Sequence, residues 1–177
     1  MTDQPQPQGG PAVPTFVEDV FLTDAFLIKG RLRNKSKRLS NQLEDHSRSF
    51  LQIDDATMIS LRGHEVIRTP TVMVNVTEII FAHELLDVAG DETLRRLAMP
   101  DKNVRIRAFY NGAVQFELAG AVEPGAYEMQ HNARRYFIMQ QPSLRGLDLT
   151  HPELKFLGEV EYAIVRKDKM AYVYDFR

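Results

Sequence analysis

Six basic side chains gather within ten residues in the first quarter of the chain, where they could hold phosphate groups. They are Lys29, Arg31, Arg33, Lys35, Lys37 and Arg38, and no acidic residue lies between Ala25 and Leu43. Guanidinium groups bind phosphate oxygens through paired hydrogen bonds, and salt weakens such binding. The run is therefore a candidate nucleic-acid or nucleotide site. The other interpretation is a solvated strand face whose charges discourage pairing with another strand.

The remaining polar residues form no recognised catalytic or metal-binding pattern. None of the five histidines is four residues from another, and neither H-E-x-x-H nor a glycine-rich phosphate loop occurs. The chain has no cysteine, which excludes disulfides, thiolate metal sites and cysteine nucleophiles. We therefore expect no catalytic residue, no metal and no cofactor. The weaker alternative is an enzyme with a cleft between the two halves of the chain, holding His83 or His131.

Length and charge limit the remaining classes of protein. A chain of 177 residues forms one ordinary domain or two small ones, and a net charge of −2 gives no overall attraction to nucleic acid or an acidic membrane. No apolar run approaches the roughly 18 residues of a membrane helix, and the N-terminus lacks the features of a signal peptide. We expect a cytoplasmic protein without membrane contact. Residues 1–14, which include four prolines, predict a flexible tail.

Alternating and β-branched runs predict a strand-rich fold. Residues 24–33 alternate apolar and basic positions, and residues 71–84 form the richest β-branched run, so both indicate strands. A short capped helix is expected at about residues 40–46. Asn111-Gly112 between two alternating runs indicates a hairpin. The last two strands are expected to form a pair, joined by a turn at residues 166–169.

Aromatic residues are frequent in the second half, among them Tyr136, Phe137, Tyr172 and Tyr174. Core packing explains most of them, because large aromatic side chains dominate protein interiors. A platform that stacks nucleic-acid bases would instead need two or three of them exposed on one sheet face beside arginines. Arg105, Arg107 and Arg135 are the arginines for that alternative.

The two halves repeat the same order of segments. Three blocks of the first half align with three blocks of the second: residues 25–32 with 114–122, 47–53 with 134–140, and 71–82 with 162–173. These alignments match Gly30 with Gly120, Phe50 with Phe137 and Val74 with Val165, at offsets of 90, 87 and 91 residues. We interpret them as the duplication of one unit. The other interpretation is the general similarity of any two β-rich segments.

The expected architecture is mainly β, within the α+β class. Two similar strand–helix–strand–strand units, residues 15–84 and 104–177, would form small barrels or one merged double sheet with pseudo-twofold symmetry. Units of about 70 residues bury too little surface to be stable alone, so the two should pack against each other. Residues 85–103 would be a helical connector, since acidic residues open it and arginines close it before Pro100.

The segment from Ala25 to Glu84 resembles an uncharacterised bacterial domain family of unknown function. The similarity is carried by four short motifs, Gly30-Arg31-Leu32, Arg38-Leu39-Ser40-Asn41-Gln42-Leu43, Phe50-Leu51-Gln52-Ile53-Asp54-Asp55-Ala56, and Thr69-Pro70 through the strand Val74-Asn75-Val76. The usual aspartate of the family is replaced here by Asn41. The resemblance implies a compact β-rich unit of bacterial origin, and it transfers no catalytic residue.

These observations favour a non-catalytic interaction or assembly module. Its partner would be another protein or a second copy of the chain, reached through an exposed edge strand. The alternative is a nucleic-acid or nucleotide-binding module that uses the basic run at residues 29–38.

Overall fold

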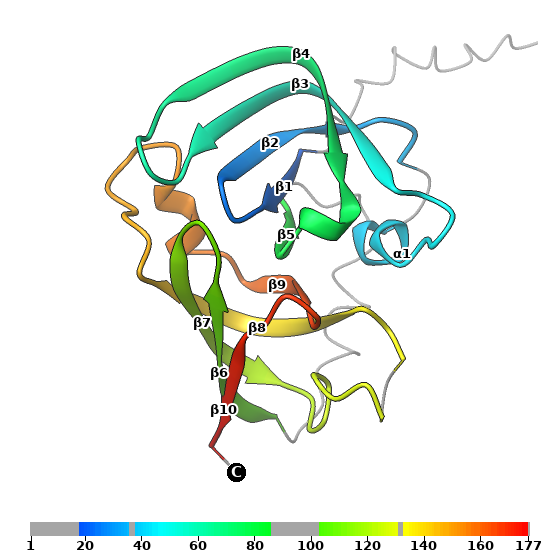
Figure 1. Ribbon diagram of the computed structural model, residues 1–177, viewed down its shortest axis with the longest axis vertical. Coiled ribbons are helices and arrows are strands. Elements are labelled where there is room, and N and C mark those ends of the chain that lie inside the picture. The colour runs from blue at the N-terminus through cyan, green and yellow to red at the C-terminus, as the bar shows by residue number, and fades with distance from the viewer. Residues whose placement is uncertain (1–17, 36–37, 86–102, 131–132, 177) are drawn as a thin grey trace, which may run out of the picture.

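The computed structural model describes residues 18–35, 38–85, 103–130 and 133–176, and it is mainly β (Figure 1). Ten strands form one antiparallel sheet that does not close between its outer strands. The expected strand-rich class is therefore confirmed, whereas neither half closes into a barrel through pairing of the described strands. No helix in these ranges is long and apolar enough to cross a membrane.

The first half contains five strands, one short α-helix and one 3-10 helix. Their bounds are β1 (Asp19–Leu22), β2 (Phe26–Leu32), α1 (Leu39–Leu43), β3 (Phe50–Ser60), β4 (Val66–Asn75), the 3-10 helix η1 (Val76–Glu78) and β5 (Phe81–Glu84). The expected helix at about 40–46 is thus close to α1. The expected single strand over residues 71–84 is wrong, because η1 turns the chain between β4 and β5.

The second half contains five further strands. Their bounds are β6 (Val104–Asn111), β7 (Gln115–Val122), β8 (Tyr136–Arg145), the 3-10 helix η2 (Lys155–Gly158), β9 (Tyr162–Arg166) and β10 (Tyr172–Asp175). The hairpin predicted at Asn111-Gly112 is confirmed by the β6–β7 pair. The predicted pairing of the last two strands is wrong: β9 lies between β8 and β5, whereas β10 pairs with β6.

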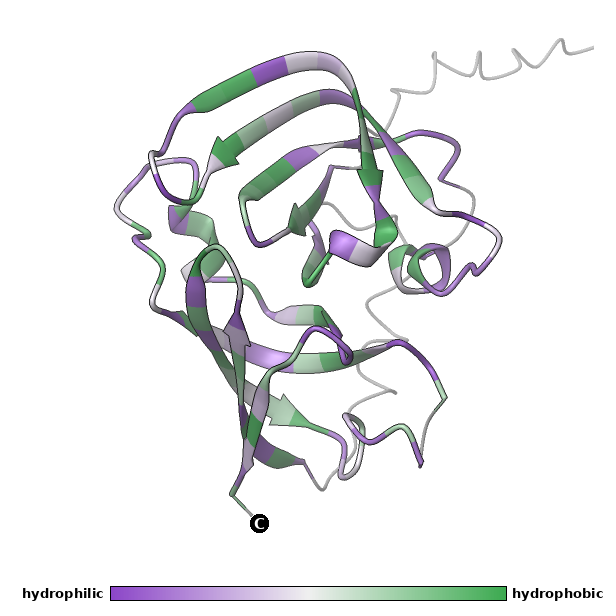
Figure 2. Ribbon diagram, viewed as in Figure 1, coloured by the Kyte–Doolittle hydropathy of each residue, from purple (hydrophilic) through white to green (hydrophobic). Residues whose placement is uncertain are grey.

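Hydrophobic and hydrophilic residues alternate along most of the strands (Figure 2), as expected for strands with one buried face. In β6, for example, Ile106, Ala108 and Tyr110 are buried between less buried neighbours. The four residues of β1 are all buried instead, so this strand lacks alternation and the sequence did not reveal it. Its apolar residues, Val20, Phe21 and Leu22, belong to two different cores, so the strand is covered on both faces.

Both halves have the same strand order when each strand is matched with the strand five places later. The order is β5-β1-β2-β3-β4 in the first half and β10-β6-β7-β8-β9 in the second. Five pairs of residues occupy the same places in the strand registers of the two halves: Asp19 and Ile106, Gly30 and Gly120, Asp54 and Gln140, Val74 and Val165, and Phe81 and Tyr172. The strand pairing therefore agrees residue by residue.

The sequence alignment agrees with the strand registers in the first and last blocks and is displaced in the middle block. The offsets of 90 residues at Gly30 and 91 residues at Val74 are those of the strand registers. The middle block is shifted by one residue, because Leu51, and not Phe50, takes the place of Phe137 opposite the valine of the next strand. Matching the two phenylalanines was misleading, since Phe50 is exposed and Phe137 is buried.

Each half has a β-bulge at its matched glycine. Gly30 and Gly120 each face two residues of the next strand, where the strand register shifts. The first of those two residues has a positive φ in both halves, 50° at Asp55 and 46° at Gln141. A bulge bends its strand and strengthens the local twist, so both halves curl at the same point.

We expect Gly30→Ala and Gly120→Ala each to lower the free energy of unfolding by about 1–3 kcal/mol, the usual cost of overpacking. An added Cβ would lie 2.6 Å from Ile53 Cγ2 in the first half and 2.5 Å from Met139 Cγ in the second. Gly158→Ala is the matched control, because nothing lies within 4 Å of its added Cβ. Urea unfolding followed by circular dichroism measures all three. An equal cost at Gly158 would contradict the steric explanation.

Two hydrophobic cores lie on opposite faces of the central strands. Phe21 of β1 and Ala82 of β5 belong to the core of the first half, whereas Leu22 and Phe81 of the same strands belong to the core of the second. Val165 of β9 joins Phe81 there. Removing apolar surface from water is the main stabilising term in folding. One face of the first half's strands therefore packs into the core of the first half, and the opposite face packs into the core of the second half.

The two halves meet where β5 pairs with β9, which we call the seam. Phe81 lies opposite Val165, and the N–H of Arg166 donates to the carbonyl of Ile80 at 2.9 Å. The counterpart of β9 in the first half is β4, and the counterpart of β5 in the second is β10. A twofold axis would make β4 and β10 pair in the same way, but they are the outer strands of the sheet. The halves therefore join head to tail, without the expected pseudo-twofold symmetry.

Two predicted segments lie outside the described residues. They are the flexible tail at residues 1–14 and nearly all of the helical connector at residues 85–103. The unit boundaries drawn at 84 and 104 fall at the end of β5 and the start of β6.

Candidate functional site

The basic run begins on β2, where each of its charges has a carboxylate partner. Lys29 forms an ion pair with Glu153, and Arg31 forms one with Asp55. Arg33 makes a bidentate contact with Asp54, in which Nε and Nη2 donate to the two carboxylate oxygens at 2.8 and 2.7 Å. A phosphate bound at this face of β2 would therefore have to displace carboxylates.

The carboxylate partners respond to this pairing through their pKa values. Hydrogen bonds from Arg33 hold the pKa of Asp54 below its usual value, and the hydrogen bond from Lys29 does the same for Glu153. Asp54 and Asp55 lie on β3, the strand that pairs with β2. They follow the basic run by less than two dozen residues. The sequence showed a basic segment because the acids that neutralise it belong to other segments.

The rest of the basic run leaves the strand. Lys35 lies partly buried beside β1, and Lys37 lies outside the described residues. Arg38 occupies the N-cap position of α1. The six candidate residues therefore do not share one face: only Lys29 and Arg31 lie on β2, and Arg33 follows directly after its last residue.

Lys35 joins a buried and a partly buried carboxylate on adjacent strands. Its Nζ lies 2.6 Å from Asp19 Oδ1 and 2.7 Å from Glu84 Oε1, and these two acids are directly opposite each other in the β1–β5 pair. The N–H of Leu39 donates to Glu84 at 3.0 Å, and the hydroxyl of Tyr162 contacts Glu84 at 3.3 Å. The cluster ties the start of α1 to the middle of the sheet.

The two carboxyl groups of this cluster differ in their pKa values. Burial raises the pKa of Asp19 to about 6, although its hydrogen bond with Lys35 acts in the opposite direction. Burial also raises the pKa of Glu84, but hydrogen bonds from Lys35 and Leu39 outweigh it and leave the pKa below its usual value. Asp19 Oδ2 has no hydrogen-bond partner among the described residues. Lys35 therefore pairs with both carboxylates, and Asp19 is the first of the two to take up a proton as the pH falls.

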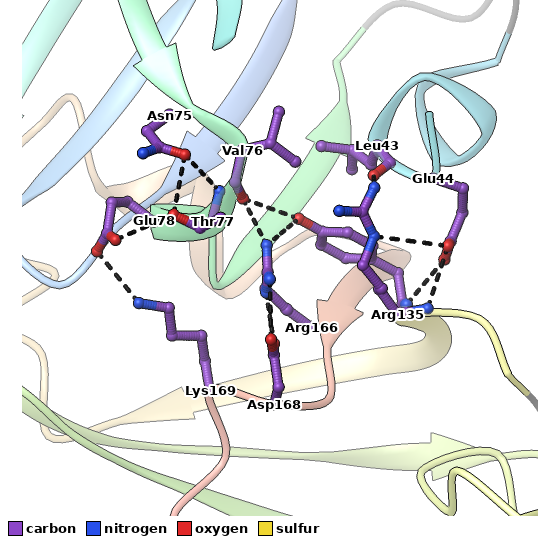
Figure 3. A network of polar contacts seen from close by, with 11 residues as sticks. Leu43, Glu44, Asn75, Val76, Thr77, Glu78, Arg135, Arg166, Asp168 and Lys169 are labelled. Carbon is purple, nitrogen blue, oxygen red and sulfur yellow. Dashed lines mark hydrogen bonds and ion pairs between the residues drawn. The ribbon is translucent and has the colours of Figure 1, made fainter. Parts of the chain in front are cut away.

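A second polar network holds the two halves together on the other side of α1 (Figure 3). The buried guanidinium of Arg166 donates through Nη1 to the carbonyl of Val76 at 2.7 Å and to the hydroxyl of Tyr136 at 3.3 Å. The hydroxyl of Tyr136 donates to the same carbonyl at 3.1 Å. Asp168 pairs with the other side of the guanidinium. The end of β9 is thus bound to η1 of the first half.

The same network reaches the C-terminal end of α1. Arg135 Nη2 donates to the carbonyl of Leu43 at 2.7 Å, and the backbone N–H groups of Arg135 and Tyr136 donate to the carboxylate of Glu44 at 3.1 and 2.8 Å. Last-turn carbonyls of a helix lack partners within the helix, and a guanidinium satisfies them well. These contacts are structural, because they satisfy backbone groups at the junction of the halves.

Three aromatic side chains are exposed at the C-terminal edge of the sheet, and we call them the β10 edge cluster. Tyr172, Tyr174 and Phe176 are 70%, 58% and 52% exposed. Tyr174 and Phe176 meet edge to face with ring centroids 4.7 Å apart, and the guanidinium of Arg107 lies 5.5 Å from the centroid of Phe176. In the described part of the chain, β10 has a neighbour on one side only, which is β6.

Core packing was expected to explain most aromatics of the second half, and the structure shows Tyr172 and Tyr174 exposed instead. The signal that could have found the cluster is the spacing of Tyr172, Tyr174 and Phe176, which puts all three side chains on one face of a strand. The pairing of this strand with β6 could not be read from the sequence.

The other outer strand, β4, also exposes apolar side chains. Ile67 and Met73 are 45% and 54% exposed. Pro70 interrupts the row of backbone donors in the middle of this strand, as prolines in outer strands commonly do. No further proline follows Pro70 in β4, so every later residue of this strand keeps its backbone donor.

The described histidines form contacts rather than a metal centre. His64 and His151 lie with ring centroids 5.6 Å apart, and the buried ring of His83 lies 4.6 Å from the ring of Tyr162. No group of three or more acidic or histidine side chains within the described ranges is placed to hold a metal ion. His131, which was the other candidate for a cleft, lies outside these ranges.

Comparison with family models, curated proteins and solved structures found no match to this chain. The resemblance of residues 25–84 to a bacterial family of unknown function therefore stays a prediction. The function has to be argued from the geometry of the described surfaces.

Proposed function

We propose that this chain is a non-catalytic interaction or assembly module that binds a partner strand at the free edge of β10. The observation that carries the proposal is the β10 edge cluster, in which three aromatic side chains lie exposed along an outer strand. The unpaired backbone groups of such a strand are a template for another strand. Exposed apolar groups of this kind mark interaction surfaces in soluble proteins, and tyrosine is enriched at protein interfaces.

The chemistry of β10 favours binding over protection. Natural outer strands are commonly protected by lysine, proline or a bulge, and β10 itself contains none of these. Its first three residues, Tyr172, Val173 and Tyr174, also have strong β propensity. Strand addition supplies main-chain hydrogen bonds, while the alternate side chains supply specificity.

We also propose that the two halves are copies of one ancestral five-stranded unit. The support is the common strand order, the agreement of the strand registers and the two bulges at Gly30 and Gly120. The copies also differ at a buried position. The position of buried Asp19 in the first half is taken by the apolar Ile106 in the second. The polar cluster around Lys35 therefore belongs to the first half alone.

The proposed function predicts association that depends on the β10 edge cluster. Sedimentation velocity of the full chain over a range of concentrations, alone and with proteins from its native source, measures that association. Replacing Tyr172 and Tyr174 together by lysine should abolish it, because charges on an outer strand oppose strand addition. Met129→Lys is the matched control, since Met129 is 57% exposed and lies outside the strands.

Two outcomes would overturn the proposal. One is association that the double lysine variant retains in full. The other is salt-sensitive binding of a single-stranded oligonucleotide that is lost in the Arg31→Ala, Arg33→Ala double variant and unchanged in the tyrosine variant. That result would assign the function to the basic run.

A further inference from the structure

The two outer strands of the sheet are the counterparts of the two strands that meet at the seam. β10 corresponds to β5 and β4 corresponds to β9, because Tyr172 holds the register place of Phe81 and Val74 holds that of Val165. β5 and β9 pair with each other inside the chain, whereas β10 and β4 each end the sheet. The β5–β9 pair is thus a contact between the counterparts of the two outer strands, β10 and β4.

We propose that β10 of one chain pairs antiparallel with β4 of a second copy, which repeats the seam between molecules. This inference rests on the proposed function of β10 and names its partner. The two edges cannot meet within one chain, because β4 lies at one end of the molecule and β10 at the other (Figure 1). A contact between two different edges is heterologous, so it builds a ring or an open filament.

The seam also gives the register of the proposed contact. Phe81 lies opposite Val165 and Ala82 lies opposite Ile164. Transferred to the matched residues, these pairs place Tyr172 opposite Val74 of the next chain, and Val173 opposite Met73. The next pair in the same antiparallel register is Tyr174 with Val72.

The backbone groups of β4 point in the direction that this register needs. The N–H of Val76 donates inward to the carbonyl of Ser49, at 2.9 Å, so the N–H of Asn75 points away from β3. At the seam, the matched donor is Arg166, whose N–H binds the carbonyl of Ile80. The N–H of Asn75 should therefore bind the carbonyl of Ala171 in the second copy.

The side chains on the two edges are complementary in character. Tyr172 would lie beside Val74, and Val173 would lie beside Met73, which is 54% exposed. The side of β4 that precedes Pro70 stays outside the contact, so the proline does not interrupt it. The matching of apolar to apolar groups favours a second copy of this chain over a charged partner.

Cysteine cross-linking between two separately purified variants tests the register, because the natural chain has no cysteine. One protein carries Val72→Cys and the other Tyr174→Cys, at a pair that the register makes non-hydrogen-bonded and close. Oxidation of the mixture should give a disulfide-linked dimer of one chain of each kind. Val66→Cys replaces Val72→Cys in the control, since six residues displace the thiol by about 20 Å along the strand. Met73→Cys with Val173→Cys is a second test pair.

The outcomes separate this inference from the proposed function. A mixed dimer from Val72→Cys, with little from Val66→Cys, supports the head-to-tail contact. Efficient cross-linking of Tyr174→Cys with itself, or equal cross-linking of the control, overturns it. Association that needs Tyr172 and Tyr174 but gives no mixed dimer with either pair overturns the second copy at β4 and leaves the function of β10 standing. Absence of any β10-dependent association removes both.

Discussion

Lys35→Met is expected to lower the free energy of unfolding by about 3–5 kcal/mol at pH 7.5, the usual cost of removing one partner of a buried ion pair. The substitution leaves Asp19 and Glu84 facing each other across the β1–β5 pair without their cation. Asp19 is fully buried, so water cannot replace the ammonium group there. Urea unfolding at several pH values measures the effect.

The pH dependence of Lys35→Met has a definite sign. Without the ammonium group, burial and mutual repulsion raise the pKa of both carboxyl groups in the folded state. A carboxyl group whose pKa is higher in the folded state stabilises the fold at low pH and loses that contribution as the pH rises. The difference between variant and wild type should therefore be largest above about pH 7 and should shrink toward pH 4. A difference that stays constant over this range would contradict the explanation.

Asp19→Asn is the matched control in the same cluster. The pKa of Asp19 is raised to about 6 in the folded protein. In the wild type this group therefore lowers the free energy of unfolding as the pH rises from about 4 to about 6. Asparagine keeps the shape and an acceptor for Lys35 but does not titrate. The variant should gain stability relative to wild type over that interval, by about 2–3 kcal/mol. A cost as large as that of Lys35→Met at pH 7.5 would show that shape, not charge, matters there.

The Lys35 cluster also shows where prediction from sequence ended. The residue was recognised as part of a basic run, but its partners Asp19 and Glu84 come from strands that are sixteen residues before it and forty-nine after it. No local pattern links them, because a strand pair is set by tertiary packing. Lys29 is a similar case, since its partner Glu153 lies in the other half of the chain.

Internal repetition supplied what local patterns could not. Gly30 and Gly120 each lie at a bulge of their own half, and the sequence offsets at Gly30 and Val74 agree with the strand registers. These two residue types align well because a close backbone approach requires glycine and a buried position requires an apolar side chain. Phe50 was misplaced by one residue because side-chain type was matched without regard to the face of the strand. The pairing of β5 with β9 could not be predicted from the sequence, because both strands are short and no sequence pattern links them.

Arg166→Met is the second large effect, with an expected loss of about 2–4 kcal/mol in the free energy of unfolding. The guanidinium donates to the carbonyl of Val76, and hydrogen bonds from charged donors contribute about 1.5–3 kcal/mol each. It also lies 5.5 Å from the ring centroid of Tyr136, where a cation–π contact adds about 0.5–2 kcal/mol. Asp168 is 60% exposed, so losing that partner costs little.

The effect of Arg166→Met should also be local to the contact between the halves. The N–H of Ile79 donates to the carbonyl of Val76 at 3.3 Å, so η1 should open more often and the Ile79 amide should exchange faster. Lys169→Met is the matched control, because Lys169 reaches the same 3-10 helix at Glu78 through an exposed ion pair of 3.1 Å. Such pairs contribute at most about 1 kcal/mol. Equal losses from the two substitutions, or faster exchange spread evenly over the sheet, would show that the buried guanidinium does not hold the two halves together.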